Sequence, residues 1–312
     1  MPPNLADQIR QYYLDNFALL PTDKQFHFAG RLYSWEHDET CRNHLVALKG
    51  LFTGDSKKIT NDLADIIANP PQAKVNAATV RQPYFNKYPA LRSLMLALFR
   101  VRHLQYLYDV DCRGQLLSVI SQEKLRGLGT TLLEDKAALK VLSTYAINYL
   151  YLLELLFPEE ESLVDAQEFY RLGKTYDTQT AENIQLYIYF YTHMIIGDTN
   201  FYERAVRDDR LSHYTAMLHD IEQLIQERFD EINLDNKLEF LVCCNICGYE
   251  TSLRDYIYKE CAESVSGNGT FLVDTFNSFQ QSNKTSLSDS EHRNVLFIMS
   301  TSPYHAQPNV LQ

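Results

Sequence analysis

The stretch Ile184–Ile196, IQLYIYFYTHMII, decides the fold class, because only Gln185, Thr192 and His193 in it are polar. A helix that is apolar on nearly every side is buried among other elements. The segment is also shorter than the roughly 20 apolar residues that cross a bilayer. We therefore expect a buried helix here, surrounded by other helices.

Helical periodicity continues on both sides of this segment. After Asp135, the apolar residues Leu139, Leu142, Ala146 and Leu153 recur at the spacing of one helix face. Similar patterns along the chain predict an all-α fold, a multi-helical array of about twelve or thirteen helices. The helices pair at a period of roughly 40–50 residues, the scale of helical repeats and of closed α/α toroids, so a toroid is one form of this fold.

The chain reads as one large helical domain over residues 1–312, with a soft boundary near residues 158–178 between an N-terminal and a C-terminal half. One helix is expected over residues 114–133, and Thr22 is expected to cap the helix over residues 23–36. Residues 70–89 and 266–290 are predicted to be the long loops.

Composition excludes several classes of function. The net charge of −11 opposes binding to nucleic acid or to an anionic membrane surface, both of which need concentrated positive charge. Residues 1–20 lack the basic and apolar regions of a signal peptide, so we expect a cytoplasmic protein with its six cysteines reduced. The 21 tyrosines suit either a large core or a cleft that borders water or a ligand.

The densest polar cluster is WEHDETCRNH, residues 35–44, and it includes Glu36, His37 and Asp38. Carboxylates beside histidines can transfer protons or bind a ligand. The alternative is structural, because Asp38 is placed to cap a helix and Glu39 suits its first turn.

His193 and Asp198 form a second candidate site. His193 lies within the most apolar segment, and a buried imidazole needs a hydrogen-bond partner. Asp198, just after Gly197, could orient that ring. The pair is interpreted either as a satisfied core histidine or as part of a pocket.

Positive charge concentrates between Ile66 and Tyr108, a stretch without Asp or Glu that includes Arg92, Arg100 and Arg102. Guanidinium groups bind phosphates and carboxylates, so an anionic ligand could bind here, or these side chains could pair with acidic residues of the protein itself.

Cys244 and Cys247 form a CxxC without a second metal-binding pair, so packing of these cysteines in the core is favoured over metal binding. Nucleotide-binding, zinc-protease and hydrolase motifs are absent from the sequence, and no cofactor or metal ion is expected.

Three short motifs carry a resemblance: YTH at residues 191–193 with Gly197-Asp198, SGNGTF at residues 266–271, and EHRN at residues 291–294. Together they make residues 184–300 resemble uncharacterised bacterial helical proteins with α/α-toroid character. The resemblance implies a central cavity lined by Tyr191, His193 and His292.

Two functions follow as hypotheses. The first is a binding or interaction protein with a Tyr-rich groove or cavity, whose partner is an unidentified protein or small molecule. The alternative is an enzyme of the α/α-barrel kind that acts on a small or anionic substrate with a pocket of histidine and carboxylate groups.

Overall fold

The computed structural model describes residues 4–69, 80–273 and 286–306. It confirms the all-α fold: the described residues form fifteen α-helices, and their only β-type pairing is a single bridge between Val265 and Leu272. The closed toroid stays a prediction. None of the described helices is long and apolar enough to cross a bilayer.

The chain divides into two compact units, a first unit of Met1–Leu45 with Phe201–Gln312 and a second unit of Val46–Asn200. Residues 158–178, where we placed a soft boundary, lie inside the second unit.

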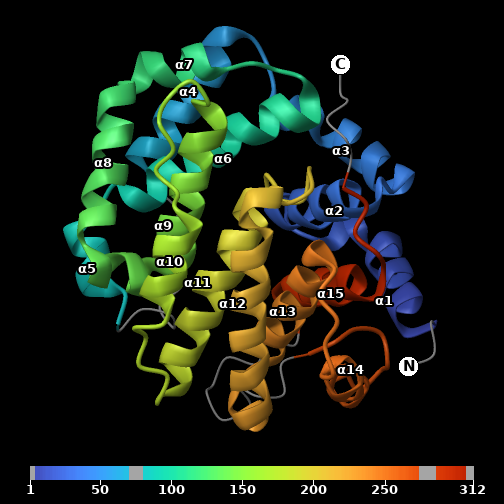
Figure 1. Ribbon diagram of the computed structural model, residues 1–312. Helices are drawn as coiled ribbons and strands as arrows, with labels where there is room; N and C mark the ends of the chain where they lie inside the picture. Colours follow the sequence, from blue (N-terminus) through green and yellow to red (C-terminus); the bar gives the residue numbers. More distant parts are fainter. Residues whose placement is uncertain (1–3, 70–79, 274–285, 307–312) are drawn as a thin grey trace. The chain divides into compact units, whose positions relative to one another are not determined.

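The first unit is built on α13 and α15. Helix α15 packs against α1, α2 and α13, and α13 also packs against α12 and α14. The helices of this unit are α1 (Asn4–Asp15), α2 (Thr22–Glu36), α12 (Asp208–Glu227), α13 (Leu234–Cys247), α14 (Arg254–Glu263) and α15 (Leu287–Thr301) (Figure 1). Helix α3 (Glu39–Phe52) begins in this unit and ends in the other.

The second unit is built on α9, which packs against α6, α8 and α11. Its helices are α4 (Ser56–Ala68), α5 (Gln82–Lys87), α6 (Leu91–Tyr108), α7 (Arg113–Val119), α8 (Gln122–Glu134), α9 (Lys136–Leu156), α10 (Ala166–Gly173) and α11 (Ala181–Asp198). Figure 1 shows α9 and α11 running side by side. Helix α11 contains the segment Ile184–Ile196, and most of its side chains are buried on all sides, as predicted.

Several helix starts follow from capping side chains. Asp135 accepts a hydrogen bond from the backbone N–H of Ala138 at the start of α9, and Thr180 accepts one from Asn183 at the start of α11. Thr22 was wrong as a cap: it is the first residue of α2, and Pro21 precedes it without a side-chain bond.

Two predicted segments differ from the structure. The single helix expected over residues 114–133 is two helices, because Ser121 takes an extended conformation and caps α8 through Lys124. Part of the predicted loop 70–89 is the short helix α5, which has a proline in its first turn, where proline is tolerated. Residues 70–79 and 274–285 of the two predicted loops lie outside the described residues.

Candidate functional site

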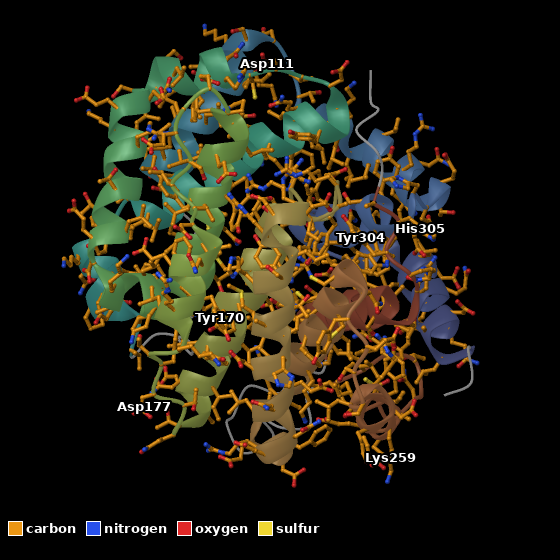
Figure 2. The ribbon with its side chains drawn as sticks, in the orientation of Figure 1. Asp111, Tyr170, Asp177, Lys259, Tyr304 and His305 are labelled. Carbon is orange, nitrogen blue, oxygen red and sulfur yellow. The ribbon has the colours of Figure 1, made fainter. Side chains whose placement is uncertain are left out.

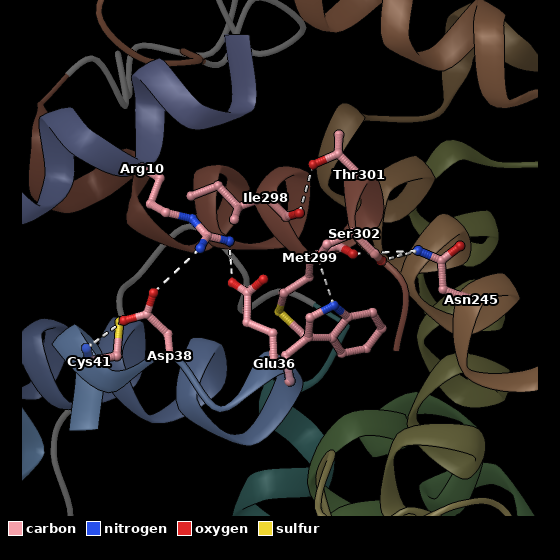
Figure 3. A network of polar contacts seen from close by, with 10 residues as sticks. Arg10, Glu36, Asp38, Cys41, Asn245, Ile298, Met299, Thr301 and Ser302 are labelled. Atoms are coloured by element: carbon pink, nitrogen blue, oxygen red, sulfur yellow. Dashed lines mark hydrogen bonds and ion pairs between the residues drawn. The ribbon is translucent and has the colours of Figure 1, made fainter. Parts of the chain in front are cut away.

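The predicted cluster at residues 35–44 is held by Arg10 of α1. Its guanidinium pairs with the carboxylate of Glu36 and, at 3.4 Å, with that of Asp38 (Figure 3). Asp38 also accepts a hydrogen bond of 2.7 Å from the backbone N–H of Cys41, so it caps α3. His37 ends α2 in the left-handed conformation, and its ring lies edge-on to Tyr33. Capping and ion pairing therefore account for this cluster.

The end of α15 is fixed by side chains from α13 and α2. Asn245 donates to the carbonyl oxygen of Ser302, and Trp35 Nε1 donates to Ser302 Oγ at 3.0 Å (Figure 3). Asn245 also donates to the carbonyl oxygen of Ser300. Beyond this, the Tyr304 ring lies against that of Trp35, with centroids 4.7 Å apart and the ring planes tilted by 37°. These contacts satisfy carbonyl groups that a helix leaves open at its C-terminus.

The second predicted site lies in the second unit. The His193 ring nitrogen Nδ1 is 2.8 Å from Asn148 Oδ1, on the neighbouring helix α9. The Tyr191 hydroxyl donates to the carbonyl oxygen of Tyr170, and Asp198 is fully buried at the end of α11. His193 is therefore a hydrogen-bonded histidine at the α9–α11 packing interface.

The three arginines of α6 are not gathered into one site. The guanidinium of Arg100 lies over the ring of Phe52, at 4.7 Å from its centroid, and burial lowers its pKa. Arg102 is buried and donates to both the side chain and the carbonyl oxygen of Asn200. Because Arg100 and Arg102 are two residues apart on one helix, they point to opposite sides. Arg92 is half-buried and is the second residue of α6.

The cysteine motif lies partly in the core, because Cys247 is only half-buried. Cys243 and Cys244 are fully buried, and burial raises the pKa of both thiols well above the usual value. Within the described ranges, no three His, Cys, Asp or Glu side chains are grouped so that they could hold a metal ion.

The structure brings together a different set of titratable groups around Glu291. Its carboxylate, which is fully buried, accepts a hydrogen bond of 2.7 Å from His27 Nδ1 and one of 3.2 Å from Lys24 Nζ. The His292 ring lies parallel to that of His27, with centroids 5.7 Å apart. Arg31 lies one turn beyond His27 on α2, with its guanidinium over the ring of Tyr202. We call Lys24, His27, Arg31, Glu291 and His292 the Glu291 cluster.

Helix geometry places this cluster. Lys24, His27 and Arg31 are spaced three and four residues apart, so they lie on one face of α2. That face meets the first turns of α15, where Glu291 lies. Asn294, one turn further on α15, donates to the Tyr13 hydroxyl and to the carbonyl oxygens of Leu272 and Ser290. The cluster is therefore anchored to rigid helices on both sides.

The electrostatics of the cluster favour an ionised carboxylate beside a neutral imidazole. Burial opposes ionisation of Glu291, but His27, Lys24 and Arg31 together hold its pKa below the usual value of 4.5. Burial lowers the pKa of His27 below 6.5, and the cations Arg31 and Lys24 lower it further against the attraction of Glu291.

His27 remains open to solvent on one side. Its side chain is 31% exposed and that of Lys24 is 28% exposed, whereas the Glu291 side chain is at 0%. Within the described part of the chain, His27 Nε2 makes no hydrogen bond. A buried carboxylate thus fixes the ring through Nδ1, while part of the His27 side chain stays exposed.

Sequence reasoning missed His27, Lys24, Arg31 and Glu291, although EHRN at residues 291–294 was noted and His292 was named. The predicted cavity residues Tyr191 and His193 belong to the second unit, and His292 belongs to the first. Within its unit, His292 lies against His27. A charged triplet at helical spacing on α2 was a weak signal, because such residues are common on solvated helix faces.

Comparison with known proteins adds no relative: no protein-family model, no curated protein and no solved structure matches this chain.

Proposed function

We propose that the protein is a binding protein that takes a small anionic ligand at the Glu291 cluster. One observation carries the proposal: the buried Glu291 fixes the His27 ring through Nδ1 at 2.7 Å, while the side chains of His27 and Lys24 are 31% and 28% exposed. A binding site needs polar groups that are held in place before the ligand arrives.

Charge supports an anion as the ligand. Lys24 and Arg31 bring two positive charges against the single negative charge of Glu291, while the depressed pKa of His27 keeps that ring neutral at pH 7. The cluster is therefore net positive in a protein whose net charge is −11. A local positive site of this kind attracts phosphate or carboxylate groups.

The Tyr-rich groove or cavity expected from composition would draw on aromatic rings of the same unit. Tyr13 stacks on Phe28 with centroids 5.2 Å apart, and Tyr12 stacks on Phe271 at 5.9 Å. Tyr12 is half-buried, so its ring can contribute apolar area to a ligand.

A thermal-shift titration tests the proposal with inorganic phosphate, acetate and citrate at low ionic strength. We expect at least one anion to raise the melting temperature, since a ligand at 100 times its Kd stabilises by about 2.7 kcal/mol. Lys24→Gln and His27→Gln should each reduce that shift.

Lys259→Gln is the matched control, because Lys259 projects from α14 with 77% of its side chain exposed (Figure 2). This variant should keep the full anion-induced shift. No shift with any anion, or equal losses in Lys24→Gln and Lys259→Gln, would rule out the site.

A second candidate function is an enzyme of the α/α-barrel kind. The same contact between His27 Nδ1 and Glu291 Oε1 is the arrangement by which a carboxylate orients a general base. Turnover of ester or phosphoester substrates that is lost in both His27→Gln and Glu291→Gln would favour the enzyme. Binding without turnover would favour the binding protein.

The proposed setting is the cytoplasm, without nucleic acid as a partner. The net charge of −11 supports the absence of a nucleic-acid partner, because it repels polyanions outside the local cluster. The central cavity implied by the resemblance to toroid-like proteins stays a prediction.

A further inference from the structure

Asn236 is a polar side chain inside the core of the first unit. It lies in the first turn of α13, and none of its surface is exposed. Neither its Oδ1 nor its Nδ2 atom has a hydrogen-bond partner in the part of the chain that the structure describes.

Another buried asparagine of the same unit shows how unusual this is. Asn294 is equally buried, but its amide nitrogen donates to the carbonyl oxygens of Leu272 and Ser290, and its oxygen accepts from the backbone N–H of Leu272 at 2.8 Å. A carboxamide offers two donor and two acceptor positions, and buried groups of this kind are nearly always bonded. Asn236 leaves all of these positions open.

The neighbouring residue points the same way. Asp235 accepts from Arg293 through Oδ2 at 3.0 Å, while its buried Oδ1 atom has no hydrogen-bond partner within the described ranges. Open hydrogen-bonding positions thus occur on two consecutive residues in the first turn of α13.

Charge limits what could fill these positions. Asp235 is already paired with Arg293, and the buried Lys237 is paired with Glu260 at 2.6 Å. The ion pairs beside Asn236 are therefore balanced, and a further buried charge would have no counter-ion. A neutral molecule that has both a hydrogen-bond donor and an acceptor can bond to both the oxygen and the nitrogen of the Asn236 amide.

We propose that Asn236 binds a small neutral hydrogen-bonding molecule in an interior site of the first unit. Water is the smallest molecule with this chemistry, and a solute with a carboxamide group is the alternative source. Interior waters commonly satisfy buried polar groups in this way.

A crystal structure of the full chain tests the proposal directly. We expect non-protein density within hydrogen-bond distance of both Asn236 Oδ1 and Nδ2, where a single peak indicates water and an extended one a solute. Mass spectrometry of small molecules released on unfolding separates these two sources. An empty site beside a well-ordered Asn236 would overturn the proposal.

Paired variants give a second readout. Asn236→Leu keeps the approximate volume of the side chain and removes its hydrogen-bonding groups. If the site is occupied, this variant melts at a lower temperature, as the control Asn294→Leu must, since that change breaks bonds visible in the structure. If Asn236 is unpaired, Asn236→Leu melts at a higher temperature, because an unsatisfied amide is removed from the core, and the proposal is wrong. Should either variant fail to fold, the wild-type crystal structure decides.

Discussion

Asp109 ends α6 in the left-handed conformation, with φ 55°, and its side chain is exposed. That conformation costs a residue with a Cβ atom roughly 1–2 kcal/mol, whereas glycine adopts it freely. We expect Asp109→Gly to raise the free energy of unfolding by about 0.5–1 kcal/mol, after allowing for the larger entropy of glycine in the unfolded chain. Urea denaturation followed by circular dichroism measures the gain. Asp109→Ala removes the same charge and keeps the Cβ atom, so an equal gain there would assign the effect to charge.

His27 should make the stability of the protein depend on pH. Its pKa in the folded protein lies below the usual 6.5, so the unfolded chain binds more protons there, and stability falls as the pH drops below about 6.5. Glu291 has a lowered pKa too, but it costs stability only below its usual value of 4.5. His27→Gln should therefore flatten the fall in melting temperature between about pH 7 and pH 5. His219→Gln, at an exposed histidine of α12, should leave the slope unchanged. A slope that persists in His27→Gln would contradict the assignment.

At the scale of elements, the close approach of α9 and α11 depends on Gly197. A Cβ atom built there would lie 2.3 Å from the ring of Tyr151, which belongs to α9. Glycine within a helix normally costs about 0.5–1 kcal/mol relative to alanine, but overpacking a core costs about 1–3 kcal/mol. We expect Gly197→Ala to lower the free energy of unfolding. Gly127→Ala, in α8 with nothing within 4 Å, should raise it. Stabilisation by both changes would show that the two helices are not packed at this distance.

Helix boundaries also show which features of an element can be predicted from sequence. Asp135 and Thr180 each accept a hydrogen bond from the backbone N–H three residues later, and a cap of this kind can be inferred from sequence because it involves only nearby residues. The break at Ser121 was missed because apolar periodicity runs through it. The Ser121 hydroxyl accepts a hydrogen bond from the backbone N–H of Lys124, and apolar periodicity does not report this local bond. The burial of the segment 184–196 was predicted, because a helix that is apolar on all sides is stable only in the interior of the protein.

At the scale of the whole molecule, the site could not be predicted in the same way. His27 and Glu291 are 264 residues apart, and His193 and Asn148 are 45 apart. The residues of each pair come into contact only because their two helices pack against each other. A single sequence does not show which helix surfaces pack together. The roles weighed for Asp38 illustrate the contrast: its capping function involves Cys41 nearby and could be inferred, whereas its ion pair with Arg10 of α1 could not.

The two units should unfold together, because α3 runs without interruption from Leu45 in the first unit to Val46 in the second. Loss of either unit would cut this helix, and a short helical remnant is not stable alone.

Leu142 is fully buried in α9 of the second unit, and Leu142→Ala should lower the free energy of unfolding by about 2–5 kcal/mol. Trp35, the single tryptophan, is buried in the first unit and reports on that unit alone. We expect Leu142→Ala to lower the urea midpoint measured by Trp35 fluorescence as much as the midpoint measured by circular dichroism. Leu51→Ala, at a leucine that is 58% exposed, should move neither. A Trp35 midpoint that stays at the wild-type value while circular dichroism shows an earlier loss of helix would mean that the units unfold separately.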